Sequence, residues 1–326
     1  MNRKITILFL ISAGFLLNAC QKDIDVFVPD QGQIGGPDTS WYSIITPSMP
    51  VADVRNSLMI DTYKDSFQVS NNSTITTPGG LQCNFPANCC VGNTGQTITG
   101  NVNVEMMLVR KKGDMIRLGT PTTSNNRLLV SGAQVFIRLK KDNNELHLAP
   151  GTRIEAKYTE QPISTQLKFF KGDASNATAF NWMPNTDISD SFFITPNYYQ
   201  FKSAHLNWLG SAYFYDTTGI SRVAVKADLA SYFTNANTIA YTVFKDYRSV
   251  VGMYGDISSK KFITGFLPVG KAITVVVISK QGNDYFLGYQ NTITAAPSAG
   301  GPPVQSVQVI PIKSSLSNII AFLNTL

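Results

Sequence analysis

Cys20 is the residue of this 326-residue chain whose surroundings most clearly predict a chemical reaction. Residues 2–4 are Asn-Arg-Lys, residues 5–17 form an almost wholly apolar run, and Leu-Asn-Ala stands directly before Cys20. A basic start, a short apolar run and small or uncharged residues before a cleavage point are typical of a secretory signal peptide. With a cysteine at that point the pattern is a lipobox, in which the thiol is diacylated and becomes part of the first residue of the mature chain.

Two alternatives to the lipobox stay open. Asn18 departs from the small apolar residue usual two positions before such a cysteine, so the segment could be an ordinary cleaved signal or an uncleaved anchor. The apolar run of 13 residues is too short to cross a bilayer core of roughly 30 Å as a helix. We therefore expect residues 1–19 to be removed and a covalent diacylglycerol lipid on Cys20 to anchor the protein to a membrane. No other cofactor is predicted.

The other three cysteines, Cys83, Cys89 and Cys90, lie within the ten-residue segment LQCNFPANCC. Close thiols tend to pair in an oxidising compartment, so a disulfide between Cys83 and either Cys89 or Cys90 is predicted, with one thiol left over. A strained bridge between Cys89 and Cys90 and three reduced, buried cysteines are the alternatives. A zinc site is less favoured, because three thiolates are one ligand short of the usual four.

The chain has two histidines, His147 and His205, 58 residues apart. A catalytic triad or a histidine-based metal cluster would have to use one of them, and their separation argues against both. The sequence contains no G-x-S-x-G turn, Walker loop or G-x-G-x-x-G motif. Asp187, Asp190 and Asn185 could offer oxygen ligands to Ca²⁺, although a polar loop between two domains explains them better. We expect no catalytic residue, no metal and no enzymatic activity.

Four aromatic residues flank the predicted junction between two domains: Trp182, Tyr198, Tyr199 and Trp208. Aromatic faces next to Asn and Gln side chains are typical of a carbohydrate platform, because the rings stack on sugar C–H faces and the amides bind hydroxyls. Alternatively, the rings are packed between two domains, since large aromatic side chains bury much apolar area. Packing is the favoured interpretation.

Charge and composition narrow the class of protein. Without residues 1–19 the chain loses two of its 27 basic residues, Arg3 and Lys4, which leaves 25 against 21 acidic residues and a net charge of +4. No cluster of four or more basic residues exists, which argues against nucleic-acid binding. The apolar fraction of 43%, the aromatic fraction of 11% and the low charged fraction of 15% favour an all-β extracellular protein.

The segment after Cys20 is polar, rich in Gly, Pro and Asp, and without periodicity, so residues 20–65 are predicted to be a tether with a lead-in strand. Lys22, Asp23 and Asp25 resemble the short acidic export signal of surface-displayed lipoproteins of Bacteroidota-type bacteria. That resemblance implies an outer-membrane lipoprotein exposed on the cell surface. Retention on the periplasmic side, with these charges as plain linker, is the alternative.

Strand-like runs follow one another at short intervals and predict two β-sandwich domains, over residues 66–185 and 196–326. Residues 99–110 alternate, with Val102, Val104, Met106 and Leu108 on one face. Residues 140–144 and 282–284 have the composition of hairpin turns. One helix is predicted, at the C-terminus, where Leu316, Ile319, Ile320 and Leu323 follow a Ser-Ser cap.

Motifs in the first of the two predicted domains resemble the bacterial version of the β-sandwich domain shared by ankyrins, netrin receptors and zonula-occludens proteins. The resemblance covers about residues 75–172. It rests on four motifs: Gly79-Gly80-Leu81 with the following Phe85-Pro86-Ala87-Asn88, then Thr99-Gly100-Asn101-Val102, Asp114-Met115-Ile116 and Leu128-Leu129-Val130-Ser131-Gly132. The three cysteines depart from that pattern, which has apolar or small residues there. The resemblance implies a scaffold or interaction role and brings no catalytic residue.

The sequence therefore predicts a non-enzymatic, membrane-anchored lipoprotein that acts as a scaffold or adhesion module, with other envelope proteins as partners. The alternative is a glycan-binding lipoprotein that assists polysaccharide capture.

Overall fold

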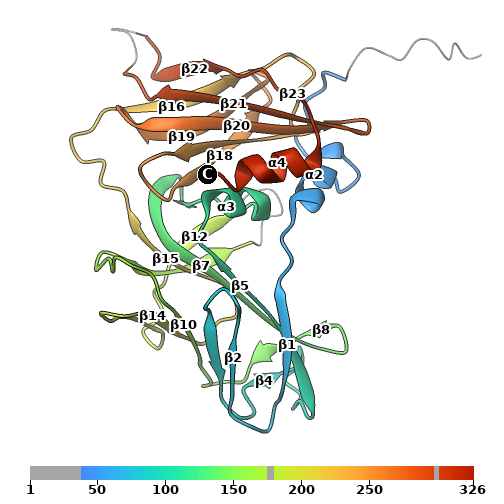
Figure 1. Cartoon of the computed structure of the whole chain (residues 1–326), viewed down its shortest axis with the longest axis vertical. Coiled ribbons are helices and arrows are strands. Elements are labelled where there is room, and N and C mark those ends of the chain that lie inside the picture. The colour runs from blue at the N-terminus through green and yellow to red at the C-terminus, as the bar shows by residue number, and fades with distance from the viewer. Residues whose placement is uncertain (1–37, 175–179, 297–300) are drawn as a thin grey trace, which may run out of the picture. The chain divides into compact units, whose positions relative to one another are not determined.

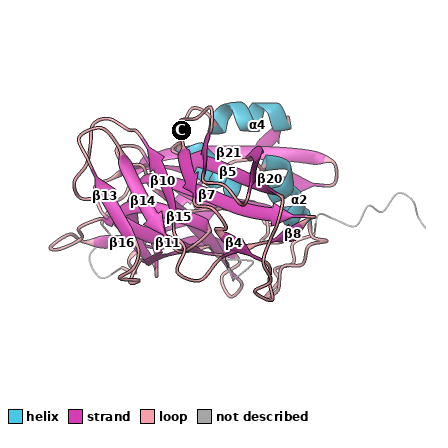
Figure 2. Cartoon of the chain, turned by 90° about the horizontal axis from the view of Figure 1, so that it is seen from below, coloured by secondary structure: helices cyan, strands magenta, loops and turns pink. Residues whose placement is uncertain are grey.

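Strands dominate the computed structural model, which describes residues 38–174, 180–296 and 301–326 (Figure 1, Figure 2). Thr39–Leu326 makes up one compact unit, and the description below is confined to it. The all-β class and the short C-terminal helix are confirmed. Cys20, Lys22, Asp23 and Asp25 lie outside the described residues. No helix within the described ranges is long and apolar enough to cross a membrane.

Two sheets form the first sandwich. The first sheet has the order β1 (Tyr63–Gln68), β5 (Asn101–Val109), β7 (Arg127–Lys141), β15 (Asn207–Phe214), β11 (Lys168–Asp173) and β12 (Asn181–Pro184), with β6 (Thr123–Ser124) and β8 (Asn144–Glu145) paired to β7. The second has the order β13 (Ser191–Ile194), β14 (Tyr199–Ser203), β10 (Ile154–Tyr158), β3 (Gln82–Phe85) and β2 (Ser73–Thr76). A small pair, β4 (Cys90–Val91) and β9 (His147–Leu148), stands beside them.

The core of this sandwich follows from the period of two along its strands. In β5, Val102, Val104 and Met106 are buried in the core between the sheets, whereas Asn101 and Asn103 are exposed. This confirms the alternation predicted for residues 99–110.

The second sheet system is one eight-stranded sheet. Its order is β22 (Val304–Gln308), β16 (Arg222–Asp228), β19 (Lys261–Pro268), β18 (Val250–Asp256), β17 (Thr238–Phe244), β20 (Ala272–Gln281), β21 (Asp284–Ile293) and β23 (Ile312–Ser314). Its central strands carry apolar residues on both faces: Ile239 and Tyr241 belong to one hydrophobic cluster, and Ala240 and Phe244 to another. Burial of both faces explains why β20 is apolar almost throughout.

Three helices, rather than the single one predicted, pack against one face of this sheet. They are α2 (Pro50–Leu58), α3 (Lys112–Leu118) and α4 (Leu316–Leu323), and all three contribute to the hydrophobic cluster that contains Ile239 and Tyr241 (Figure 1). Pro50 stands at the start of α2, where a missing N–H costs nothing, and Val51, Val54 and Leu58 share its buried face. Residues 50–58 are thus part of the folded core. The prediction that they belong to a tether is wrong.

The predicted boundary between the domains, at residues 185–196, is also displaced. β14 and β15 hydrogen-bond to β10 and β7 of the first sandwich, so the change from one sheet system to the other falls between Phe214 and Arg222. Backbone bonds join the two systems: the Ser131 N–H donates to the Arg248 carbonyl at 3.0 Å, and the Thr122 N–H donates to the Val250 carbonyl at 2.7 Å. The first sandwich and the eight-stranded sheet therefore form one continuous structure.

Candidate functional site

The predicted disulfide is absent: Cys83, Cys89 and Cys90 are free thiols, and all three are buried. Cys83 is fixed in β3 between Ile75 of β2 and Ala156 of β10. Cys90 is instead held in β4, opposite Leu148 of β9, so backbone pairing commits the thiols to different ladders. Burial raises the pKa of the Cys83 thiol, which keeps it protonated and unreactive.

The four aromatic residues proposed as a carbohydrate platform do not form one. Trp182 and Tyr199 are 3% and 1% exposed, whereas Tyr198 and Trp208 are half-buried. Tyr199 belongs to the core between the two sheets of the first sandwich. Trp182 belongs to a separate cluster with Phe170, and its Nε1–H donates to the Pro121 carbonyl at 3.0 Å. Trp182 and Tyr199 are thus packing groups, but within the first sandwich and not between two domains, where the favoured interpretation had placed them.

The two histidines have different surroundings. His147 is exposed on β9. His205 lies beside Asp187 and Asp190, and one ligand atom from each of these three residues lies within 4.8 Å of the others. Asn185 is not part of this cluster, because its side-chain amide donates to the Asp187 carbonyl at 3.2 Å within the same turn.

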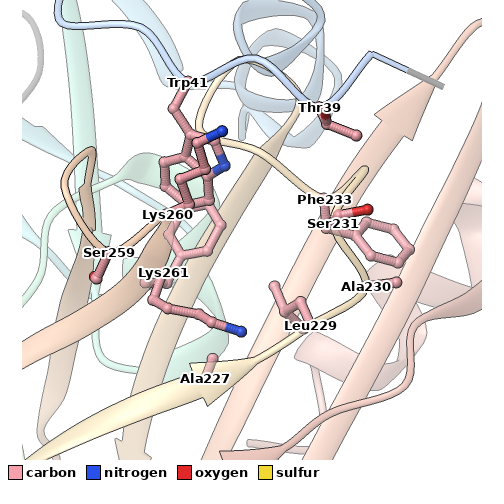
Figure 3. Close-up of a pocket in the computed structure, with 11 residues that line it drawn as sticks. Thr39, Trp41, Ala227, Leu229, Ala230, Ser231, Phe233, Ser259, Lys260 and Lys261 are labelled. Carbon is pink, nitrogen blue, oxygen red and sulfur yellow. The ribbon is translucent and has the colours of Figure 1, made fainter.

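A cavity with a volume of about 230 Å³ lies on the eight-stranded sheet (Figure 3). Its residues come from the segment before α2, from the stretch that follows β16, and from the turn between β18 and β19. They are Thr39, Trp41, Ala227, Leu229, Ala230, Ser231, Phe233, Ser259, Lys260, Lys261 and Phe262. Figure 3 shows Trp41 and the two lysines on one side of the space, and Ser231 and Phe233 on the other.

Hydrogen bonds hold the Trp41 wall in place. The side chain of Asn235 accepts from the Tyr42 N–H at 3.0 Å and donates to the Tyr42 carbonyl at 2.7 Å, which ties the segment to the sheet system. The Trp41 ring packs against Phe262, with centroids 5.1 Å apart. An exposed segment is thereby fixed over an apolar floor.

The rim beside Trp41 is formed by the turn between β18 and β19, which side-chain hydrogen bonds hold in place (Figure 3). Asp256 accepts hydrogen bonds from the hydroxyls of Ser259 and Ser258 at 2.6 and 2.7 Å, and these bonds hold the pKa of its carboxyl below the ordinary value. The turn places Lys260, whose φ is +53°, at the edge of the cavity. Lys261 pairs with Asp228 at 3.2 Å.

The cavity has a mixed apolar and polar lining. The cavity combines an apolar floor, one indole wall, two ammonium groups and three hydroxyls. Neither a histidine nor a carboxylate lines it, and the Ser259 hydroxyl at its edge donates to Asp256 at 2.6 Å. Sequence reasoning missed this site; its only signal was a large aromatic residue, Trp41, placed just after a stretch rich in glycine and proline.

No protein-family model matches this chain, and no curated protein matches it either.

Proposed function

We propose that the protein is a non-enzymatic lipoprotein of the cell envelope that acts as a scaffold or adhesion module. In this proposal the lipid on Cys20 anchors it to the outer membrane, with the folded unit exposed at the cell surface. The signal segment and lipobox of residues 1–20 support the anchor, and the acidic residues after Cys20 support surface display.

The observation that carries the binding role is the cavity beside Trp41. It begins at Thr39, so 18 residues separate it from Cys20. Such a segment reaches at most about 60 Å when fully extended. The residues that line the cavity therefore begin soon after the predicted anchor in the sequence.

The size and chemistry of the cavity favour a side chain of a protein partner. Small-molecule pockets usually measure about 300–1,000 Å³, so 230 Å³ suits one large apolar or aromatic side chain. Interfaces between proteins are often centred on such an anchor in a desolvated pocket, surrounded by a polar rim. Lys260 and Lys261 at the rim would favour an acidic group next to that anchor. We therefore expect an envelope protein that presents an apolar side chain beside a carboxylate.

The alternative function is glycan binding in support of polysaccharide capture. It depended on a platform of four aromatic residues, and these residues do not form one.

Photo-crosslinking from the cavity rim tests the proposal. A photoreactive amino acid replaces Ser231, an exposed residue lining the cavity, in the full chain expressed in its own cells. The control places it at Ser66, an exposed residue of β1 in the first sandwich. We expect a defined protein adduct from position 231 and none from position 66. Equal labelling from both positions, or no adduct together with a specific hit on a glycan array, would overturn the proposal.

The anchor has its own test. Cys20→Ser should abolish labelling by a fatty-acid analogue and release the protein from the membrane fraction. Continued labelling of that variant would refute the lipid anchor. Protease shaving of intact cells tests surface display, and substitution of Lys22, Asp23 and Asp25 should trap the protein inside.

A further inference from the structure

Asp187, Asp190 and His205 meet where two loops of the first sandwich come together. Asp187 and Asp190 lie between β12 and β13, and His205 lies between β14 and β15. Each loop leads from one sheet of the sandwich to the other, since β12 and β15 belong to one sheet and β13 and β14 to its partner. A group bound here would tie together two crossings between the sheets.

The distances between these side chains are those of metal ligands. His205 Nε2 lies 3.4 Å from Asp187 Oδ2 and 3.6 Å from Asp190 Oδ2. A hydrogen bond between such atoms would measure about 2.7–3.2 Å. Two ligands that each stand about 2.0–2.1 Å from a tetrahedral zinc ion lie roughly 3.3–3.5 Å apart. The two separations from His205 are close to this second spacing, and the ligand atoms of all three residues lie within 4.8 Å of one another.

Each carboxylate is already oriented by its other oxygen. Asp187 Oδ1 accepts from the hydroxyl of Ser189 at 2.6 Å and from its N–H at 2.9 Å. These bonds leave its Oδ2 directed at His205. Asp190 Oδ1 accepts from the Ala204 N–H at 2.8 Å. Outer hydrogen bonds of this kind fix the ligands of metal sites and leave one oxygen of each carboxylate free to coordinate.

The inner oxygen of Asp190 lacks a cationic partner of its own. The side chain is fully buried, and the Ser203 hydroxyl approaches Oδ2 only to 3.5 Å, beyond the usual range of 2.5–3.0 Å for O–H···O. Within the described part of the chain, no Lys or Arg forms an ion pair with Asp187 or Asp190. A buried carboxylate without a compensating charge is costly, so a cation at this point would be strongly favoured.

His205 can serve as the nitrogen ligand. Its Nε2 faces the two carboxylates and the Lys171 ammonium, which lies 3.0 Å away, and in the tautomer with the ring proton on Nδ1 this nitrogen offers a lone pair to a metal. The ring is 40% exposed and Asp187 is 33% exposed, which leaves one side of the cluster open to solvent. Water can therefore complete a fourth position.

The ligand set selects the metal. Ca²⁺ takes six to eight oxygen ligands, and the Oδ1 of Asn185, which could have supplied one, accepts from the Asp187 N–H at 3.4 Å within its own turn. Two carboxylates and one imidazole suit Zn²⁺, which accepts mixed oxygen and nitrogen ligands in tetrahedral sites.

We propose that Asp187, Asp190 and His205 bind one Zn²⁺ ion, which clamps the two loops of the first sandwich and keeps one exchangeable water position. Lys171 then turns away from the ion. This site goes beyond the proposed docking function and does not depend on it.

The test uses the mature chain with Cys20→Ser, freed of metal by a chelator and titrated with ZnCl₂ against a chromogenic competitor. We expect one ion per chain at micromolar or lower free zinc, together with a rise in melting temperature. Asp190→Asn and His205→Gln should each weaken binding at least tenfold. Ser189→Ala, which removes only an outer hydrogen bond, should weaken it about tenfold. Lys171→Met should tighten it, because a competing charge is gone.

Matched controls separate this site from other possible ligands. His147→Gln removes the second histidine and Asp256→Asn removes a carboxylate held by serines in the same way, so neither should change zinc affinity. Co²⁺ bound in place of zinc should show visible d–d bands and no sulfur-to-cobalt charge transfer, which would reveal the cysteines. Circular dichroism of each metal-free variant confirms that it is folded. Absence of binding, a thiolate spectrum, or unchanged affinity in a folded His205→Gln chain would overturn the proposal.

Discussion

The indole rings of Trp182 and Trp208 meet edge to face, with their centroids 6.5 Å apart and their planes at 84°. Phe180 completes the group, and it meets Trp182 edge-on at 5.0 Å. This geometry is the preferred packing of aromatic rings in a core, and it is incompatible with the coplanar array that would stack on a sugar. Phe180, Trp182 and Trp208 therefore form part of the packed interior of the fold.

Trp182→Ala should lower the free energy of unfolding by about 3–5 kcal/mol, because it empties a buried site and strands the Pro121 carbonyl. Urea denaturation followed by circular dichroism measures this. The control is Phe193→Ala, at a residue 48% exposed, which should change stability by no more than about 0.5 kcal/mol. A Trp182→Ala chain as stable as the wild type would show that this ring is not a packing group.

Gly113 is required by the close approach of α3 to α4. A Cβ atom at this position would stand 1.8 Å from the carbonyl oxygen of Leu323. Gly113→Ala should therefore cost about 1–3 kcal/mol of stability, although alanine favours helices more than glycine does. Gly252→Ala, where the nearest atoms lie 3.9 Å away, is the matched control and should be nearly neutral. Thermal unfolding of both variants decides the point, and equal melting temperatures would contradict it.

The state of the cysteines can be counted directly. In the mature chain with Cys20→Ser, a thiol reagent should find no reactive thiol in the native protein, because Cys83, Cys89 and Cys90 are buried. After denaturation without reductant it should find three. Raising the pH from 7 to 9 should not make the Cys83 thiol reactive, since burial raises its pKa above the ordinary value and keeps it protonated. A count of one thiol after denaturation would establish the disulfide instead.

Glu105 should make stability depend on pH. Burial raises the pKa of its carboxyl, but hydrogen bonds from Arg138 and Lys140, at 2.8 and 3.0 Å, outweigh this and leave the pKa below the ordinary value. A carboxyl with a lowered pKa in the folded state stabilises the fold at neutral pH, and this contribution is lost as the pH falls through that pKa.

Glu105→Gln should therefore reduce the free energy of unfolding by about 1–2 kcal/mol at pH 7. The deficit should shrink at pH 3, below the ordinary pKa of about 4.3 for a glutamate, because protonation then weakens the same bonds in the wild type. Urea titrations at the two pH values give the comparison. An identical deficit at both values would contradict the assigned role.

Local patterns in the sequence were enough to predict the class of fold and several elements. The residues at the turn between β7 and β8, Asp142 and Asn143, have φ values of +50° and +64°, as a tight hairpin of this composition requires. The C-terminal helix begins where Ser315 caps it, with its hydroxyl accepting from the Asn318 N–H. Such features depend on neighbouring residues and can be read from them.

Features that depend on distant residues were not predictable in this way. β15 pairs with β7, about 75 residues earlier in the chain. Its sequence is equally compatible with a strand of the second predicted domain, in which it had been placed. Helix α2 did carry a signal, Pro50 followed by apolar residues at helical spacing, but it stands in a region that resembled a tether. Its partner, the eight-stranded sheet, lies far along the sequence.

The candidate sites depend on the same long-range assembly. Trp41 and Phe262 are more than 200 residues apart, and they meet only because the segment before α2 lies along the sheet. The sequence indicated Asp187 and Asp190 as possible oxygen ligands. His205 lies beside them only because the fold brings its loop next to theirs. Residue types indicated part of the chemistry, and topology supplied the rest.

The central claim, that an envelope protein docks in the cavity beside Trp41, is tested most directly by the yield of crosslinked adduct from position 231 in cells. Trp41→Ala should lower that yield at least tenfold, because it removes one wall of the cavity. Tyr254→Ala, at a residue 58% exposed and outside the cavity, should leave it unchanged. Equal adduct from the Trp41→Ala chain, with its fold verified by circular dichroism, would contradict the account.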